Sequence, residues 1–206
     1  MPGLFITFEG GDGSGKTTQI ELLTSWLEAK EKTVIVTREP GGTDLGNEVR
    51  HLVMHRKGFI APRAEALLYA ADRSHHVQTI VRPALERGEI VVQDRYSDSS
   101  IAYQGAGRVL DKDEIKDLSA WATEGLAPDL TILLNVSAEV AKLRRSKPSS
   151  DFDRLEAEDE NFHNRVRESY LLLAKREPGR WLVIDGEMTV EKIHAQILAK
   201  VALMLE

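Results

Sequence analysis

Residues 4–17 read LFITFEGGDGSGKT and place a glycine-rich segment directly after a short apolar run. Residues 4–9 are apolar and rich in β-forming types, which is typical of a buried parallel strand. Residues 10–17 fit the spacing G-x-x-x-x-G-K-S/T, and apolar residues then recur at helical spacing from Ile20 to Leu27. A strand, a glycine-rich loop and a helix in this order predict a phosphate-binding loop.

The residue types in this loop suit a nucleoside triphosphate. Glycines let backbone N–H groups curl around phosphate oxygens, and the start of the helix adds free N–H groups. We expect Lys16 to contact the β- and γ-phosphates, and Thr17 to offer its hydroxyl to Mg²⁺, which prefers oxygen ligands. The alternative, a glycine-rich turn that contains Lys-Thr by chance, is disfavoured by the strand–loop–helix context. The predicted ATP-binding residues of the loop are Gly10, Gly11, Asp12, Gly13, Ser14, Gly15, Lys16 and Thr17.

The composition is that of an ordinary globular protein. The 206 residues suit one α/β domain, with 42% hydrophobic and 29% charged residues. A net charge of −6 argues against a broad nucleic-acid surface, and the lack of cysteine excludes disulfides and thiol chemistry. No apolar run approaches the roughly 20 residues of a membrane span, and no signal-like segment opens the chain. We therefore expect a cytoplasmic protein that binds neither nucleic acid nor membrane.

The rest of the chain alternates strands with helices. Pro83 either kinks the long helix that begins at Pro62 or starts a new one. This alternation predicts a five-stranded, mostly parallel sheet with helices on both faces. After the first strand, further strands are expected at residues 33–37, 90–94, 130–136 and 181–185, and helices at residues 16–30, 45–55, 62–80, 111–124, 138–145, 161–177 and 190–205.

Several classes of phosphate-loop protein fit poorly. No asparagine is followed by lysine, so the base-reading Asn-Lys-x-Asp motif of guanine-specific GTPases is missing, and a motor or recombinase-type ATPase normally needs a longer chain. The chain length and the basic residues around residues 146–153 (SKPSSDFD) resemble nucleoside monophosphate kinases, in which a mobile lid closes over ATP. We expect one P-loop kinase domain over residues 1–206, with a small lid at about residues 144–156.

Five short motifs narrow the resemblance to the thymidylate kinase family. They occur in the family's order and spacing, and they cover essentially the whole chain. The resemblance implies transfer of the γ-phosphoryl group of ATP to dTMP with Mg²⁺, giving dTDP for dTTP biosynthesis, by a homodimer. The motifs are EGxD at residues 9–12, TREPGGT at residues 37–43, YAADR at residues 69–73, DRY at residues 94–96, and SS with AYQG within residues 99–105.

The resemblance assigns charged residues to the acceptor phosphate and the metal. Arg95 follows the third strand, where ligands sit in open α/β sheets, and is expected to grip the acceptor phosphate and the transferring group. Asp94 would orient Mg²⁺-bound water or Arg95, and Glu9 would help to order Mg²⁺ or an arginine. Arg38 and Arg50 are further candidates for the acceptor phosphate. Each residue also has a purely structural alternative. Asp94 could cap a strand, and Glu9 could be a charge at a strand end. Arg95 could form a surface ion pair, and Arg50 could be a solvated helix residue.

The base and sugar are assigned in the same way. Tyr69 and Arg73 lie four residues apart on one helix face, where the family stacks an aromatic ring on thymine and donates from arginine to a base carbonyl. Tyr69 alone could equally be a core residue. Ser100 and Gln104, also four apart, could reach the polar edge of the base. The predicted dTMP-binding residues are Asp12 (at the 3′-hydroxyl, or alternatively a turn former), Arg38, Arg50, Tyr69, Arg73, Arg95, Ser99, Ser100, Tyr103 (excluding a 2′-hydroxyl) and Gln104.

The lid supplies the remaining candidates. Asp12 is followed by Gly13-Ser14, so the phosphate loop carries no arginine, and the branch of the family without one uses basic lid residues instead. Arg144 is expected to pack on adenine; the alternative for the whole cluster is a solvated basic turn. The predicted catalytic residues are Lys16, Asp94, Arg95, Arg145, Lys147 and Arg154, and the predicted metal-binding residues are Glu9, Thr17 and Asp94.

Two rival functions stay open. One is a kinase for another nucleotide or for a deoxynucleoside. The other is a regulatory module that binds a nucleotide and changes conformation without turnover. The Asp94-Arg95-Tyr96 and Tyr69/Arg73 sets argue against the second rival, because a switch needs no second nucleotide pocket.

Overall fold

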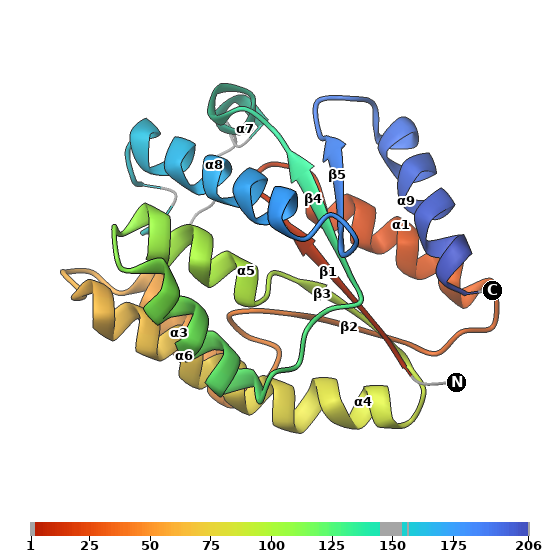
Figure 1. Ribbon diagram of the computed structural model, residues 1–206, viewed down its shortest axis with the longest axis horizontal. Coiled ribbons are helices and arrows are strands. Elements are labelled where there is room, and N and C mark those ends of the chain that lie inside the picture. The colour runs from red at the N-terminus through yellow and green to blue at the C-terminus, as the bar shows by residue number, and fades with distance from the viewer. Residues whose placement is uncertain (1–2, 145–153, 156, 206) are drawn as a thin grey trace.

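The computed structural model describes residues 3–144, 154, 155 and 157–205, and its centre is a parallel β-sheet (Figure 1). The strand order is β2-β3-β1-β4-β5, and every pairing between neighbours is parallel. Helices cover both faces of this sheet, which confirms the predicted α/β fold class (Figure 1). The strands are β1 (Leu4–Glu9), β2 (Val34–Arg38), β3 (Ile90–Asp94), β4 (Leu130–Asn135) and β5 (Trp181–Asp185).

The alternation of side chains along β1 builds a core on each face of the sheet. Ile6 and Phe8 are fully buried against the helices α1 (Lys16–Glu28) and α9 (Val190–Met204), which run side by side (Figure 1). Phe5 points to the opposite face, where it packs with Val77 and Val81. A strand that is apolar on both faces belongs in the middle of a covered parallel sheet, and β1 is its central strand.

The helical segments differ in detail from the expected ones. Residues 45–55 form a helix that changes to a wider π-helical turn at its end, and residues 97–107, for which no helix was expected, are helical throughout. The helices are α1 (Lys16–Glu28), α2 (Asp44–Arg50), α3 (Pro62–His76), α4 (Arg82–Glu86), α5 (Ser97–Ser100), α6 (Lys112–Thr123), α7 (Ala138–Arg144), α8 (Glu160–Arg176) and α9 (Val190–Met204), with π-helical segments η1 (His51–His55), η2 (Val77–Val81) and η3 (Ile101–Gly107).

Pro83 lies in the first turn of α4, directly after the π-helical segment η2. A proline inside a regular helix lacks an N–H and clashes with the carbonyl four residues earlier. The wider turn of η2 precedes this position, so the helical run from α3 continues through η2 into α4. Pro83 therefore does not start a separate helix: the helical run continues through it and changes to π-helical geometry just before it.

The register of the strands aligns the carboxyl ends of β1, β2 and β3 at one edge of the sheet. Phe8 pairs with Asp94, and Arg38 pairs with the same residue from the other side. The phosphate loop follows β1 at this edge, so residues that are far apart in sequence meet beside it.

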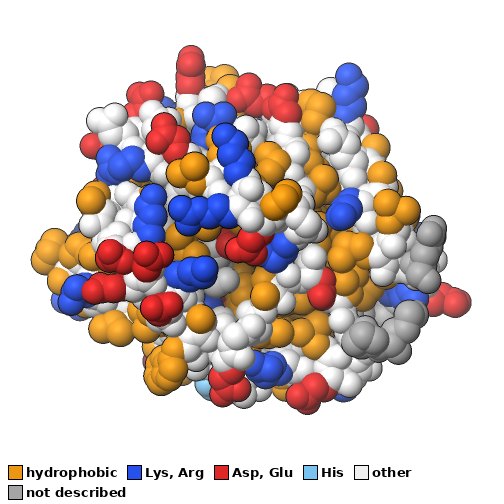
Figure 2. Space-filling view, viewed as in Figure 1, with side chains coloured by type: hydrophobic (Ala, Val, Ile, Leu, Met, Phe, Trp, Pro, Cys, Tyr) orange, Lys and Arg blue, Asp and Glu red, His pale blue; other side chains and the backbone are white. Residues whose placement is uncertain are grey.

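On the face seen in Figure 2, acidic and basic side chains are interspersed. Within the described part of the chain, no helix combines the length and the apolar character that a membrane crossing requires.

Candidate active site

Glycines give the phosphate loop its path. Gly10, Gly13 and Gly15 have φ angles of +135°, +81° and +96°, a region that side chains rarely adopt. A Cβ atom on Gly10 would also lie 2.7 Å from the carbonyl oxygen of Leu134 on β4. Gly15 is the residue before α1, so the loop delivers the free N–H groups of that helix to its concave side.

Lys16 lies within the loop that precedes it. Its side chain is 6% exposed, and Nζ donates to the carbonyl oxygens of Gly10 at 3.1 Å and Gly11 at 3.2 Å. Asp94 Oδ1 is 3.9 Å from the same nitrogen. Burial, together with the nearby Arg95 guanidinium, lowers the pKa of Lys16. The ammonium group is therefore held where phosphate oxygens entering the loop would meet it.

Arg95 leaves β3 with an unusual backbone conformation. Its φ of +67° is rare for a residue with a side chain, and its N–H donates to the carbonyl of Phe8 on β1. The guanidinium lies 4.9 Å from the ring centre of Tyr103, and one of its nitrogens is 2.7 Å from Asp12 Oδ1. The turn after β3 thus aims this arginine at the phosphate loop, where Asp12 holds it.

Glu9 is fully buried beneath Arg95. Its carboxylate accepts hydrogen bonds from the Tyr96 N–H at 2.9 Å, the Ser99 hydroxyl at 2.6 Å and the Tyr170 hydroxyl at 2.8 Å. Burial, with the charge of Asp98, raises the pKa of Glu9 to about 7. Both oxygens are engaged by the protein, so the carboxylate anchors the segment after β3 in this structure, and its predicted metal role stays a prediction.

A pocket opens beside the phosphate loop and collects the residues expected to bind the acceptor. It lies between the phosphate loop, the ends of β2 and β3, the helix α3 and the segment η3. Glu39, Pro40, Met54 and Leu155 also line it, and the motifs did not single these out as binding residues. We call it the acceptor pocket. The predicted residues in its wall are Asp12, Thr17, Arg38, Arg50, Tyr69, Arg73, Asp94, Arg95, Ser99, Ser100, Tyr103 and Gln104.

Arg73 is the most enclosed cation of the acceptor pocket, with a side chain only 2% exposed. Its Nε donates to Glu39 Oε2 at 2.7 Å, and its terminal nitrogens donate to the Ser100 hydroxyl at 3.0 Å and the Tyr96 carbonyl at 3.2 Å. These bonds hold the guanidinium in one orientation against the pocket wall.

Glu39 belongs to a second, deeper chain of buried contacts. Its Oε1 lies 3.0 Å from His76 Nδ1 and accepts from Gln93 Nε2 at 3.0 Å. The other ring nitrogen of His76 lies 2.6 Å from the Thr37 hydroxyl. Sequence reasoning missed His76 and the part that Glu39 plays, because their partners lie on separate strands and helices and no spacing connects them.

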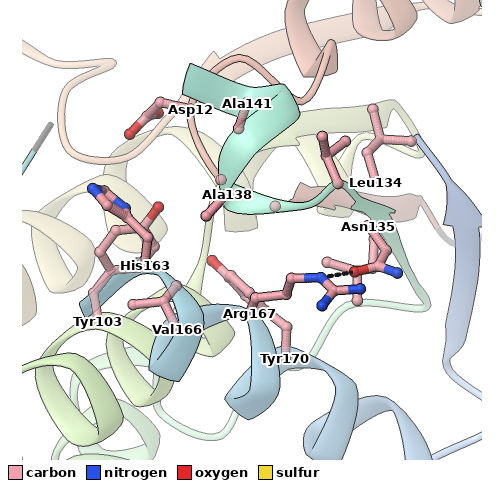
Figure 3. Close-up of a pocket in the computed structure, with 14 residues that line it drawn as sticks. Asp12, Tyr103, Leu134, Asn135, Ala138, Ala141, His163, Val166, Arg167 and Tyr170 are labelled. Atoms are coloured by element: carbon pink, nitrogen blue, oxygen red, sulfur yellow. Dashed lines mark hydrogen bonds between the residues drawn. The ribbon is translucent and has the colours of Figure 1, made fainter. Parts of the chain in front are cut away.

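A neighbouring pocket lies between the phosphate loop, the end of β4 and α8 (Figure 3). Asp12 and Tyr103 line both this pocket and the acceptor pocket, so the two adjoin. Arg167 of α8 reaches across it and donates from Nε to Asn135 Oδ1 at 2.8 Å (Figure 3). The sequence motifs did not indicate Arg167.

The predicted lid residues are described only in part. Arg145 and Lys147 lie outside the described residues. Arg144 donates to the Gly186 carbonyl at 2.8 Å, beside the end of β5. Arg154 donates to the Val53 carbonyl at 3.1 Å and pairs with the buried Glu65 on α3. The recorded bonds of Arg154 thus run to α3 and η1, and its predicted catalytic role stays a prediction.

A phosphate-binding loop whose Asp12 and Thr17 also line an adjoining acceptor pocket is the arrangement of a P-loop nucleotide kinase. The family model of thymidylate kinase matches residues 8–197. The chain is 60% identical over 205 residues to the thymidylate kinase of Clavibacter sepedonicus, covering 100% of this chain and 97% of the relative. The chain belongs to the thymidylate kinase family.

Two further relatives agree with this assignment. The thymidylate kinase of Leifsonia xyli subsp. xyli is 63% identical over 196 residues, covering 95% of this chain and 93% of the relative. The crystal structure of thymidylate kinase from Ehrlichia chaffeensis superposes with a TM-score of 0.79 at 34% identity, covering 98% of this chain and 99% of that one. Members of the family are ATP-dependent kinases that phosphorylate dTMP.

Proposed function

We propose that the chain carries out the reaction of its family, ATP + dTMP → ADP + dTDP, with ATP on the phosphate loop and dTMP in the acceptor pocket. The observation that carries this proposal is that Asp12 and Thr17 of the loop line the same pocket as Tyr69 and Arg73 of α3. An acceptor held there lies next to the end of a triphosphate on the loop. Placing two reactants side by side lowers the barrier to transfer.

Fixed positive charge supports the chemical step. Phosphoryl transfer passes through a loose transition state whose charge spreads over the phosphoryl oxygens, so cations placed in advance stabilise it. Lys16 lies in the loop and Arg95 is held by Asp12 at the border between loop and pocket. In our proposal Lys16 contacts the triphosphate, and Arg95 contacts both the acceptor phosphate and the group in transfer. Arg38 and Arg50 complete the acceptor-phosphate site.

Mg²⁺ fits the residues beside Lys16. Within the described residues, Asp94 Oδ1 is buried and accepts no hydrogen bond, and the hydroxyl-bearing Thr17 lines the same pocket. Mg²⁺ is commonly held through one or two protein oxygens, with phosphates and water completing its shell. We propose that Thr17 and Asp94, directly or through water, hold the ion, which supplies charge neutralisation at the phosphates when bound.

The nucleoside part of dTMP is proposed to lie against α3 and η3. Tyr69 stacks on the base, and Arg73, Ser100 and Gln104 face its polar edge. Tyr103, which lies under the Arg95 guanidinium, crowds the 2′ position, and Asp12 accepts from the 3′-hydroxyl. Arg73, Ser100 and Gln104 are buried and line the acceptor pocket, which supports this arrangement, because polar groups fixed in a buried pocket distinguish ligands by the hydrogen bonds that they offer.

The organisation of the whole chain is also a proposal. We infer one kinase domain with a lid at about residues 144–156, in which Arg144 packs on adenine and Arg145, Lys147 or Arg154 reaches the transferred phosphate when the lid closes. We further propose a cytoplasmic homodimer. Its support is an apolar groove between α3 and α6, where Leu67 is 58% and Trp121 is 79% exposed.

The test is acceptor-dependent release of ADP across nucleoside monophosphates. The proposal expects dTMP to be the best substrate, with dTDP as the product. A preference for dUMP, CMP or GMP would favour the rival kinase function. Tight binding of ATP without any dTDP would favour a regulatory switch.

A further inference from the structure

Glu65 is a fully buried carboxylate on α3 that the proposed reaction does not use. It lies one helical turn before Tyr69, on the side of α3 that faces the acceptor pocket. Three side chains from elsewhere in the chain converge on it: Gln104 from η3, Arg108 just after η3, and Arg154. Burial of a carboxylate costs stability unless hydrogen bonds and opposite charges replace its lost hydration, and these three partners do so.

Two of the partners are guanidinium groups. Arg108 donates from Nε to Glu65 Oε1 at 3.1 Å and from a terminal nitrogen to Oε2 at 3.3 Å, and Arg154 donates to Oε2. Arg108 has a second acidic partner, Glu158, which is 30% exposed. Both oxygens of the Glu65 carboxylate therefore accept hydrogen bonds from guanidinium groups. An ionised carboxylate only accepts hydrogen bonds.

The acceptor role of Glu65 decides which way the amide of Gln104 points. Gln104 lies 3.2 Å from Glu65 Oε1, and because the carboxylate is an acceptor only, the amide must turn its NH₂ group toward it. The amide oxygen then faces away from Glu65. Among the described residues, no donor is recorded for that oxygen, and Gln104 lines the acceptor pocket. An oxygen directed away from Glu65 in a residue that lines the pocket is available to accept a hydrogen bond from a ligand there.

We propose that Glu65 is a positioning residue: it fixes the Gln104 amide with its oxygen toward the acceptor pocket, so that the pocket selects a pyrimidine with an N3–H donor. Thymine and uracil carry that donor, whereas cytosine presents an unprotonated N3, and two acceptors facing each other leave both unpaired. This inference rests on the proposed function, because it takes the acceptor pocket to be the dTMP site. Arg108 and Arg154 act through Glu65 by holding its carboxylate in place.

The test compares Glu65→Gln with the matched control Glu158→Gln. Both changes remove a carboxylate from Arg108, but only the first releases Gln104. In Glu65→Gln we expect the ratio of kcat/KM for dTMP to that for dCMP to fall by about 10-fold or more, because the amide is free to turn over. The KM for ATP should change less than about 3-fold, and Glu158→Gln should keep the wild-type ratio. An unchanged ratio in folded Glu65→Gln would overturn the inference.

Glu65→Asp covers the case in which Glu65→Gln does not fold. It keeps the charge between the two arginines but withdraws the carboxylate from Gln104 by one methylene group, about 1.5 Å. The same fall in the dTMP-to-dCMP ratio is expected, and a wild-type ratio overturns the inference. The substrate preference of the wild-type enzyme distinguishes a failure of the proposed function from a failure of the role given to Glu65. If it does not prefer dTMP, the proposed function fails, whereas if it prefers dTMP and both Glu65 variants do so equally, only the role of Glu65 fails.

Discussion

The cations around the acceptor pocket are held by the protein before any substrate is present. Arg73 is tied to Glu39, Arg95 is tied to Asp12, and Lys16 donates to its own loop. Groups that are already oriented lose little freedom when charge develops on a phosphoryl group, and this is where electrostatic catalysis gains most. Each of these side chains should therefore have a larger effect on activity than an exposed residue of the same type.

Replacement of Lys16 tests the phosphate loop. Lys16→Ala removes the loop's point charge, and we expect kcat to fall by at least about 100-fold. Lys175→Ala, which removes an exposed lysine on α8, should leave kcat unchanged. Steady-state kinetics with saturating ATP and dTMP measures both. A near-normal kcat for Lys16→Ala would show that the loop assignment is wrong.

Replacement of Arg73 tests the base pocket. In Arg73→Ala the base loses a hydrogen bond from a charged donor. The KM for dTMP should therefore rise by about 10-fold or more, and the KM for ATP should rise much less. The change also leaves Glu39 buried without its arginine, so the unfolding free energy should fall by about 3–5 kcal/mol. Arg63→Ala removes an exposed arginine of the same helix and serves as the control. A selective rise in the KM for ATP would contradict the placement of the base.

Asp72 makes stability depend on pH. Burial, followed by the charge of Glu39, raises the pKa of Asp72 from 3.8 to about 7 in the folded state. The folded protein then binds the proton more tightly than the unfolded chain, so the contribution of Asp72 is present below about pH 4 and is lost as pH rises toward 7. Asp72→Asn does not titrate. Its unfolding free energy relative to wild type should therefore rise by about 2–3 kcal/mol between about pH 5 and pH 8.

Urea unfolding at the two pH values measures this difference. A relative stability that is the same at both would show that Asp72 titrates normally in the folded protein.

Among the elements, the strands were predictable and the helical segment after β3 was not. The strands are apolar on both faces and end at glycine or polar residues, so a local pattern identifies them. Residues 97–100 read SDSS, a composition that favours caps and turns over helix interiors. They are helical because the segment that follows buries Ala102 and Tyr103 against its neighbours. That stabilisation comes from tertiary packing, which the helix propensity of the local sequence does not reveal.

The start of α8 is a testable element because this helix carries Tyr170 to Glu9. Asp159 precedes α8, and its side chain accepts from the Phe162 N–H at 2.7 Å. Asp159→Ala removes this cap and should cost about 0.5–2 kcal/mol of unfolding free energy, whereas Asp159→Ser should retain most of it. Chemical denaturation distinguishes the two. Equal stability of Asp159→Ala and wild type would mean that the cap contributes nothing.

At the scale of the molecule, the motifs led to the pocket because parallel strands end at one edge of the sheet. Residues that follow β1, β2 and β3 must meet there, so short motifs sufficed to nominate them. The networks that hold these residues were not predictable. Tyr170 and Glu9 are 161 positions apart, and Arg154 and Glu65 are 89 apart, with no periodicity linking either pair. Only the folded arrangement of α3, α8 and β1 brings them together.

The homodimer is a prediction about the whole molecule. If two copies pair across the groove between α3 and α6, sedimentation should give about twice the chain mass of 23.0 kDa. Trp121→Lys would place a charge in that contact and should shift the protein toward the monomer. Leu203→Lys, at an exposed apolar residue of α9, should leave the mass unchanged. A monomeric wild-type protein would contradict the prediction.

The central claim is that dTMP and ATP meet across Asp12 and Thr17, and a crystal structure with bound dTMP tests it most directly. The account predicts that the base lies between Tyr69 and Gln104 and that the 5′-phosphate contacts Arg95 next to the phosphate loop. Electron density for dTMP outside the acceptor pocket, or with its phosphate directed away from Arg95, would contradict it.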